Sequence, residues 1–324
     1  MASAFVTGGS GFIGGRLIER LVREGWSVRA LARSQGAAEA VGALGAEAVH
    51  GDLSDLGALT AGARGAGVTF HAAATVADFG PWEQFERGNV EGTRNVLRAS
   101  RAAGVMRFVH VGTEAVLLHG QPLYHADETY PLAFRSKAFY SRSKALAEQV
   151  VLEQGRNGFE VVVVRPRFVW GRGDTTLLPT LVSAARSGQF RWVGGGRHRT
   201  SITHVENVVE GLLLAAQKGR PGGVYFVTDD EDAEFRAFVI ELLATQGVPA
   251  PEGDVPAFVA RALAAVGETA WRVLPLRGAP PLTRFASWVA SQECTLDDSR
   301  ARAELGYASV ISREAGLAEL SAAG

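Results

Sequence analysis

The first half of the chain alternates short apolar runs with longer amphipathic stretches. The apolar runs predict strands at residues 4–6, 27–32, 46–50, 68–71, 107–111 and 160–165. These runs are rich in valine and do not alternate with polar residues, which is typical of strands buried on both faces. The stretches between them predict helices at residues 12–23, 54–62, 83–103 and 138–155. We therefore expect an α/β fold with a doubly wound parallel sheet and right-handed crossovers.

The pattern changes after Arg165, where segments become shorter and glycine and proline recur. This half predicts helices at residues 176–187, 205–217, 233–246 and 256–275. In open α/β sheets, ligands bind beyond the carboxyl ends of the strands, where insertions can build a pocket. We therefore expect residues 1–165 to form the core, with later segments returning to it. Residues 166–324 are expected to form mainly a smaller C-terminal lobe that binds a substrate.

Residues 256–290 contain a long apolar segment. Large apolar residues, Phe258, Leu263, Val266 and Leu274 among them, are separated by small residues, which predicts a helix with an apolar face. We expect this helix to be buried by packing against the rest of the lobe. Two alternatives stay open, namely a lid over an apolar substrate and a contact with a membrane surface.

The segment TGGSGFIG, residues 7–14, lies between the first predicted strand and the first predicted helix. In such a turn Gly8 permits a tight bend, Gly11 lets backbone N–H groups approach a pyrophosphate, and Gly14 lets helix and strand pack closely. The helix N-terminus adds unpaired N–H donors and a partial positive charge. The spacing predicts a Rossmann dinucleotide-binding turn. The cofactor-binding residues expected here are Gly8, Ser10, Gly11, Phe12, Ile13 and Gly14.

The end of the second predicted strand indicates which dinucleotide binds. NAD sites usually carry an acidic residue there to hold the ribose 2′-hydroxyl, whereas this chain has Ala32 followed by Arg33. A guanidinium can pair with a 2′-phosphate, so Arg33 favours NADP(H), with NAD(H) as the alternative. The alternative is that Arg33 is a solvated surface residue. Asp52 and Leu53 follow the third strand and are expected at the adenine edge, although Asp52 could equally cap the next helix.

Tyr140 and Lys144 lie one turn apart on the helix predicted at residues 138–155, so they share a face. A free phenol has a pKa near ~10. It therefore transfers protons slowly at neutral pH unless a nearby ammonium favours the phenolate, and Lys144 can supply that charge. Downstream of a dinucleotide-binding turn, this pair predicts a redox site rather than a solvated surface pair.

The composition excludes several kinds of function. The formal net charge of −1 gives no electrostatic basis for binding nucleic acid or acidic lipid. A single cysteine, Cys294, excludes an intrachain disulfide and suits a reducing cytosol. The seven histidines show no paired ligand spacing, so no metal site is expected. We see no export signal and no apolar run near the roughly 20 residues of a bilayer span, so we expect a cytoplasmic protein.

Further motifs accompany the turn and the Tyr–Lys pair, and together they resemble the extended short-chain dehydrogenase/reductases, which share the Rossmann core. The matching segments, in family order, are TGGSGFIG (7–14), GDL (51–53), HAAA (71–74), NVEGTRNV (89–96), VGTEAV (111–116), YSRSK (140–144), RPRFVWG (165–171) and THVENV (203–208). Features similar to the 3β-hydroxysteroid and sterol dehydrogenase-like branch are FGPWEQFERGNVEGTRNV (79–96), THVENVVEGLLLAA (203–216), the apolar segment and LDDSRARAELGY (296–307).

The resemblance implies roles for the residues that match the family's catalytic motifs. Tyr140 would be the catalytic acid/base, and Lys144 would lower its pKa and hold the nicotinamide ribose. Thr113 would hydrogen-bond the substrate oxygen, since it stands where many relatives have serine. Asn89 matches the family's asparagine, for which a structural role and a proton-relay role are both open.

The resemblance also implies cofactor contacts and an assembly. Ala72, Ala73 and Ala74 would line the cofactor beside its nicotinamide half, and Pro166 and Arg167 would border the nicotinamide. Many relatives dimerise through the helices that correspond to residues 83–101 and 140–153, so a homodimer is expected.

These expectations combine into one principal hypothesis. The protein would be an NADP(H)-preferring oxidoreductase that interconverts a secondary alcohol and a ketone on a mostly apolar small molecule, of sterol or β-keto acyl type. One alternative keeps the fold and assigns a nucleotide-sugar epimerase or dehydratase with tightly bound NAD. Another is a non-catalytic NADP(H) sensor, which has no chemical need for Thr113, Tyr140 and Lys144 together.

Overall fold

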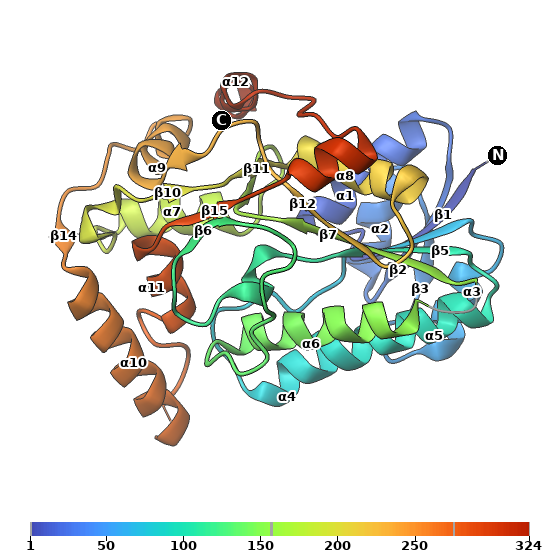
Figure 1. Ribbon diagram of the computed structural model, residues 1–324, viewed down its shortest axis with the longest axis horizontal. Helices are drawn as coiled ribbons and strands as arrows, with labels where there is room; N and C mark the ends of the chain where they lie inside the picture. Colours follow the sequence, from blue (N-terminus) through green and yellow to red (C-terminus); the bar gives the residue numbers. More distant parts are fainter. Residues whose placement is uncertain (1, 156–157, 275, 324) are drawn as a thin grey trace.

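A seven-stranded parallel sheet forms the centre of the computed structural model, which describes residues 2–155, 158–274 and 276–323 (Figure 1). From edge to edge its strands are β12 (Gly223–Val227), β7 (Glu160–Pro166), β5 (Arg107–Val111), β4 (Val68–His71), β1 (Ser3–Thr7), β2 (Ser27–Ala32) and β3 (Glu47–His50). Every neighbouring pair is parallel. The predicted fold class is therefore confirmed.

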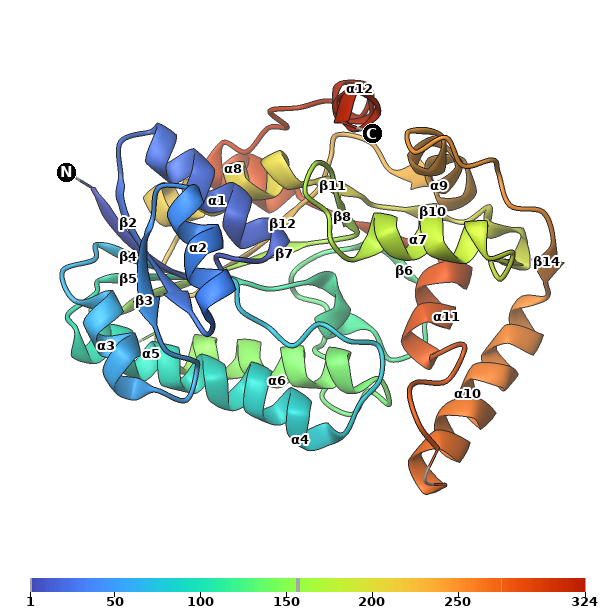
Figure 2. The same ribbon diagram turned by 180° about the vertical axis from the view of Figure 1, so that it is seen from behind.

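Helices cover both faces of this sheet (Figures 1 and 2). One face packs against α1 (Phe12–Arg23), α2 (Gln35–Ala43) and α8 (Val205–Lys218). The other packs against α3 (Leu56–Ala63), α5 (Gly92–Ala102) and α6 (Phe139–Gln154). The valine-rich strands suit this arrangement. In β7, Val161 and Val163 join one apolar layer, Val162 and Val164 join the other, and all four are fully buried.

The hydrophobic pattern predicted most strands of the central sheet correctly. The predicted strands at residues 27–32, 68–71 and 107–111 match β2, β4 and β5 residue for residue, and the predicted helix at 12–23 matches α1. Helix α2 and strand β12 were not predicted. β12 returns from the second half of the chain to pair with β7, and its five-residue run GVYFV carries no sign of that distant partner.

The helix expected at residues 83–103 is divided in the structure. It consists of α4 (Trp82–Phe85), a π-helical segment η1 (Glu86–Glu91) and α5. A π turn inserts an extra residue into a helix, and hydrophobic periodicity does not reveal such an insertion. Asn89 lies on η1 and is 1% exposed, with its amide turned toward the loop that follows β4.

A lobe formed mostly by the second half of the chain, together with residues 123–126 of the first half, lies at one end of the sheet (Figures 1 and 2). A small sheet contains β13 (Ala233–Glu234), β10 (Arg199–Thr200), β15 (Cys294–Leu296) and β6 (Leu123–Ala126). Two strand pairs are β8 (Val169–Trp170) with β11 (Thr203–His204), and β9 (Trp192–Val193) with β14 (Asp254–Val255). The remaining helices are α7 (Leu177–Arg186), α9 (Phe235–Ala244), α10 (Ala257–Val273), α11 (Arg284–Ser291) and α12 (Arg313–Ala323).

Short helical turns complete the chain. They are η2 (Glu114–Leu117), η3 (Gly194–Gly196) and η4 (Ala301–Leu305). Among the described residues, none of the helices combines the length and the hydrophobicity that crossing a bilayer requires.

The expectation that residues 256–275 form a buried helix is wrong. Helix α10 is present, but it projects from a corner of the lobe beside α11 (Figures 1 and 2). Its buried residues are Ala260, Ala264 and Glu268. Phe258 is 75% exposed and Val266 is 69% exposed, because small residues form the packed side and leave the large apolar ones facing outward. Residue 275, the predicted end of this helix, lies outside the described residues.

Candidate active site

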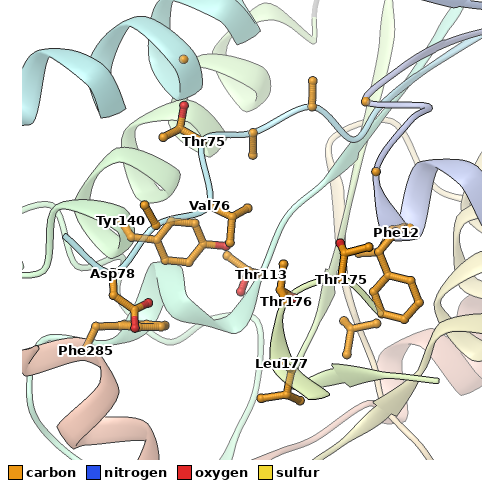
Figure 3. Close-up of a pocket in the computed structure, with 18 of the residues that line it drawn as sticks. Phe12, Thr75, Val76, Asp78, Thr113, Tyr140, Thr175, Thr176, Leu177 and Phe285 are labelled. Atoms are coloured by element: carbon orange, nitrogen blue, oxygen red, sulfur yellow. The ribbon is translucent and has the colours of Figure 1, made fainter. Parts of the chain in front are cut away.

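A cavity of about 1640 Å³ runs along the edge where the parallel strands end (Figure 3). Residues one or two positions beyond the ends of five strands line it: Gly8 after β1, Arg33 after β2, Asp52 after β3, Ala72 after β4 and Thr113 after β5. Parallel strands all end at one edge, so residues far apart in the sequence meet there. Helices α7 and α11 of the lobe form further parts of the cavity wall.

The glycine turn has the close packing that its sequence requires. Gly8 has a φ of +77°, and a Cβ there would lie 2.6 Å from the backbone nitrogen of Ala73. A Cβ on Gly14 would lie 2.1 Å from the carbonyl oxygen of Gly8. The Gly11 N–H donates to that same oxygen at 3.0 Å. Only glycine fits at Gly8 and Gly14 without moving the backbone.

This turn also suits a dinucleotide pyrophosphate. Gly11 is the N-cap of α1, where no side chain caps the helix and the first turn holds no acidic residue. The first N–H groups of α1 therefore meet the cavity with the positive end of the helix dipole. Ser10, Phe12 and Ile13 line the cavity beside the glycines. The arrangement fits the cofactor class that the sequence predicted.

The residues expected at the adenosine end also line the cavity. Arg33 is exposed beside the buried Ala32. Asp52 accepts the Ser54 N–H at 2.7 Å and the Ser54 hydroxyl at 2.6 Å, and these bonds lower the pKa of its carboxyl. The alternative that Asp52 caps the next helix is wrong, because the N-cap of α3 is Asp55. Asp52 and Leu53 instead face the cavity.

The middle of the cavity brings together the residues expected beside the nicotinamide. Ala72, Ala73, Ala74 and Pro166 all line it. Arg167 also borders the cavity, but its guanidinium is 1% exposed in an ion pair with Glu114. Its Nε donates to the Thr200 hydroxyl at 3.0 Å. The Arg167 side chain is thus engaged by protein groups.

Tyr140 and Thr113 face each other in this cavity. Figure 3 shows the Tyr140 hydroxyl pointing toward Thr113. Tyr140 stands in the first turn of α6, and its ring packs edge-on against Phe285 at 5.4 Å between centroids. Burial raises the pKa of Tyr140 most, and the carboxylates of Glu114 and Asp78 raise it further, while a hydrogen bond with Thr113 opposes them. The phenol is therefore held in its protonated form.

Lys144 lies one turn further along α6, and the structure does not bring it to the cavity wall. It is 4% exposed, and its Nζ donates to the carbonyl of Val111 at 2.9 Å and lies 3.5 Å from Nε2 of His110. Burial lowers the pKa of Lys144 to about 8, partly offset by Glu148. The ammonium is thus buried and bonded to the end of β5.

Asn89 makes the contacts of a structural residue. Its Oδ1 accepts the N–H of Thr75 at 2.6 Å, and its Nδ2 donates to the Thr75 carbonyl at 3.2 Å. Nδ2 also donates to the hydroxyl of Ser143 at 2.9 Å. This amide joins the loop after β4 to α6, the helix that carries Tyr140.

Sequence reasoning missed part of the cavity. Asp78 and Phe285 lie beside Tyr140 in Figure 3, and burial raises the pKa of the Asp78 carboxyl. The lobe contributes an apolar wall, which includes Phe168, Leu181, Phe190, Trp192, Phe235 and Val289. These residues come from short segments without a helical or strand-like hydrophobic period. Their aromatic side chains are the one feature of the sequence that could have indicated a pocket.

No group of three or more histidine, cysteine or acidic residues is arranged to hold a metal within the described part of the chain. The described residues of the cavity wall offer hydroxyl groups and buried charges. A phosphate-binding turn, a phenol and a threonine hydroxyl in one cavity are the parts that hydride transfer to a carbonyl needs.

Comparison with known proteins gives a consistent result. The profile of the 3-beta hydroxysteroid dehydrogenase/isomerase family matches residues 5–256. The chain is 49% identical over 320 residues to a 4-hydroxy-2-methyl-3-oxo-4-farnesyl-3,4-dihydroquinoline-1-oxide ketoreductase of Stigmatella aurantiaca, covering 99% of this chain and 96% of the relative. It is 36% identical to a 2-alkyl-3-oxoalkanoate reductase of Stenotrophomonas maltophilia (strain K279a), covering 98% of each.

The fold has close neighbours among solved structures. A dTDP-glucose 4,6-dehydratase from Streptomyces venezuelae, solved with NAD bound, superposes with a TM-score of 0.78. The match covers 98% of this chain and 95% of that chain at 24% sequence identity. This likeness concerns the fold.

The glycine turn generates a prediction with a matched control one residue away. Gly14→Ala should weaken NADPH binding at least about tenfold and destabilise the protein by about 1–3 kcal/mol, because its Cβ would overlap the Gly8 carbonyl. Gly15→Ala should leave both unchanged or add up to about 1 kcal/mol of stability, because its Cβ would lie 3.4 Å from the nearest atom. Urea unfolding and fluorescence titration with NADPH measure the two effects. Equal behaviour of the two variants would contradict this reading of the turn.

Proposed function

Because the chain belongs to the 3-beta hydroxysteroid dehydrogenase/isomerase family and is an NAD(P)-dependent oxidoreductase, we propose that it interconverts a ketone and a secondary alcohol on a mostly apolar molecule, with NADP(H) as the preferred cofactor. The family expected from the motifs is confirmed. One observation supports the proposed reaction and substrate. Tyr140 and Thr113 lie together in the cavity that the glycine turn also lines.

The proposed chemistry divides between the cofactor and the chain. The nicotinamide, when bound, supplies or accepts a hydride at its C4. In reduction, Tyr140 donates its hydroxyl proton to the substrate oxygen while the carbonyl carbon gains the hydride, and the phenolate then recovers a proton from water. Ketone, NADPH and a proton thus become alcohol and NADP⁺, and oxidation reverses each transfer. Thr113 contacts the substrate oxygen from the other side.

The other site residues are proposed to support this transfer. Lys144 would hold the nicotinamide ribose and stabilise the phenolate once its Nζ is shared between Val111 and the cofactor. Asn89 would fix the loop after β4 against α6. Ala73 and Pro166 would border the nicotinamide.

The apolar wall supports the proposed class of substrate. Leu181, Phe190 and Trp192 can bury a sterol or an alkyl chain. The Stigmatella relative is named for a substrate with a 3-oxo group and a farnesyl chain, and the Stenotrophomonas relative for 2-alkyl-3-oxoalkanoates. Both names combine a ketone with an alkyl or prenyl group.

Arg33 supports NADP(H) over NAD(H). It is exposed at the end of β2, where it can pair with a 2′-phosphate, and Ala32 leaves no acidic side chain to repel that phosphate.

The outward face of α10 supports a peripheral contact with an anionic lipid surface. Phe258, Leu263 and Val266 are 75%, 61% and 69% exposed. Residues 256–290 hold four arginines and one glutamate, so this segment is basic although the whole chain has a net charge of −1. The homodimer, the cytoplasmic location and the division into residues 1–165 and 166–324 stay predictions.

The first prediction from this proposal concerns the phenol. Tyr140→Phe should lower kcat/KM at least about 100-fold, because no other group in the proposed mechanism donates the proton to the substrate oxygen. NADPH consumption with a panel of 3-oxo acids and ketosteroids gives the measurement. Tyr124→Phe makes the same chemical change at a tyrosine that is 66% exposed and should keep the activity of the unmodified protein. Full turnover by Tyr140→Phe would show that the mechanism is wrong.

The second prediction concerns the cofactor. Arg33→Ala should raise the KM for NADPH about tenfold and leave the KM for NADH unchanged, because only NADPH carries the 2′-phosphate. Arg23→Ala removes an exposed arginine from the far end of α1 and should alter neither. The preference for NADP(H) is refuted if NADH is the better substrate of the unmodified protein.

The third prediction concerns α10. The unmodified protein should sediment with vesicles of anionic phospholipid, and the double change Phe258→Gln and Val266→Gln should reduce the bound fraction several-fold, since it removes the inserted apolar surface. Met106→Gln with Val310→Gln changes two exposed apolar residues elsewhere and should have no effect. No sedimentation of the unmodified protein would overturn the lipid contact.

A further inference from the structure

An acidic side chain, Asp78, lies in the cavity beside Tyr140. Asp78 stands on the loop after β4, lines the cavity and is exposed there. Figure 3 shows its carboxyl next to the rings of Tyr140 and Phe285. Among the described residues, no donor bonds this carboxyl: the influences on its pKa are its burial and the carboxylate of Glu268, and both raise it. The proposed function leaves this acid without a role.

The arginines of this part of the molecule are engaged with other groups. Arg284 of α11 donates to Glu268 of α10 at 2.7 Å. Arg167 borders the cavity and pairs with Glu114. The described side chains around Asp78 thus leave its negative charge unbalanced.

Arg191, in the apolar wall, is likewise engaged. It donates to the backbone carbonyls of Gly188 and Phe190 at 2.8 and 2.7 Å. A substrate that carries its own negative charge near Asp78 therefore brings two like charges together.

The Asp78 charge acts where the ketone is proposed to bind. The carboxylates of Asp78 and Glu114 both raise the pKa of Tyr140, so their field reaches the phenol. In a 3-oxo acid the carboxylate carbon is two bonds from the carbonyl carbon, so this charge would also lie near Tyr140. A bound substrate displaces water, which weakens the screening between like charges. An uncharged ketone of the same shape meets no such repulsion.

We propose that Asp78 is a specificity-determining residue that excludes a carboxylate next to the reacting ketone and restricts the protein to ketones whose neighbouring group is uncharged, such as an amide, an ester or a ring carbon. This inference rests on the proposed function and narrows its substrate class. The contacts of the ketone oxygen with Tyr140 and Thr113 stay as proposed above. Asp78 acts only on the group attached beside that ketone.

The test begins with the unmodified protein and three substrates of one chain length: a 3-oxo acid, its primary amide and its methyl ester. The amide matches the carboxylate in shape and lacks its charge. We expect kcat/KM with NADPH at neutral pH to be at least about tenfold higher for the amide and for the ester than for the acid. An acid reduced as well as the amide would overturn the proposal. If neither these three compounds nor any ketosteroid is reduced, the proposed function itself fails, and the two failures are thereby distinguished.

Asp78→Asn then tests the role of the charge. Asparagine keeps the size of the side chain and removes its charge, so kcat/KM for the acid should rise at least about tenfold and the preference for the amide should fall with it. Asp78→Glu retains the charge and should retain the preference.

The same variant has a second readout at Tyr140. The charged and titratable groups near the phenol are Asp78 on the loop after β4 and Glu114 on η2, with Lys144 one turn along α6 and Glu268 of α10 beside Asp78. The Asp78 carboxylate disfavours the phenolate and raises the pKa of Tyr140. Asp78→Asn should therefore move the limb of the oxidation pH profile that reports Tyr140 toward lower pH.

The control is Asp230→Asn, which makes the same chemical change at a residue that is not among those lining the cavity. The Asp230 side chain is 61% exposed and pairs with Arg302 at 3.2 Å. This variant should change neither the preference for the amide nor the pH limb. The proposal is refuted if Asp78→Asn, with turnover of the amide retained, leaves both where the control leaves them. If Asp78→Asn reduces no substrate, the comparisons in the unmodified protein and in Asp78→Glu decide.

Discussion

The common edge at which the parallel strands end is the constraint on which the site depends. Each strand delivers one short loop to that edge, and the loops after β1, β4 and β5 supply Gly8, Ala73 and Thr113 within one cavity. The packing there leaves no room for adjustment, since a Cβ on Gly8 would meet the backbone at Ala73. The buried valines of β5 and β7 hold the strands in this register. The glycine turn is thus one part of a rigid edge.

Local patterns predicted what depends on local chemistry. Three strands and helix α1 could be bounded from hydrophobic runs, and the dinucleotide turn from glycine spacing, because sterics within a few residues decide both. The position of β12 depends on a partner far along the chain. The exposed face of α10 could not be predicted either, because amphipathic spacing identifies an apolar face but not what covers it.

The Glu114–Arg167 pair shows the same limit inside the site. Glu114 stands next to Thr113 in the sequence, but nothing there reveals that Arg167 will meet it from the end of β7. A buried charge is stable only when an opposite charge pairs with it, and Glu114 and Arg167 pair with each other. This pair places the Glu114 carboxylate near the Tyr140 phenol. Tyr140 therefore lies near the acids Glu114 and Asp78. Lys144, one turn along α6, is bonded to the carbonyl of Val111. Burial and these two carboxylates raise the pKa of Tyr140 and favour the protonated phenol.

The measurement that tests the central claim most directly is the fate of the hydride. NADPH labelled with deuterium at the transferred position of C4 should be incubated with the protein and a 3-oxo substrate, and the product analysed by mass spectrometry and NMR. The account predicts one deuteron on the carbinol carbon of the alcohol, and at least about 100-fold slower formation of this labelled alcohol when Tyr140→Phe replaces the protein. An alcohol that forms without deuterium on that carbon would contradict it.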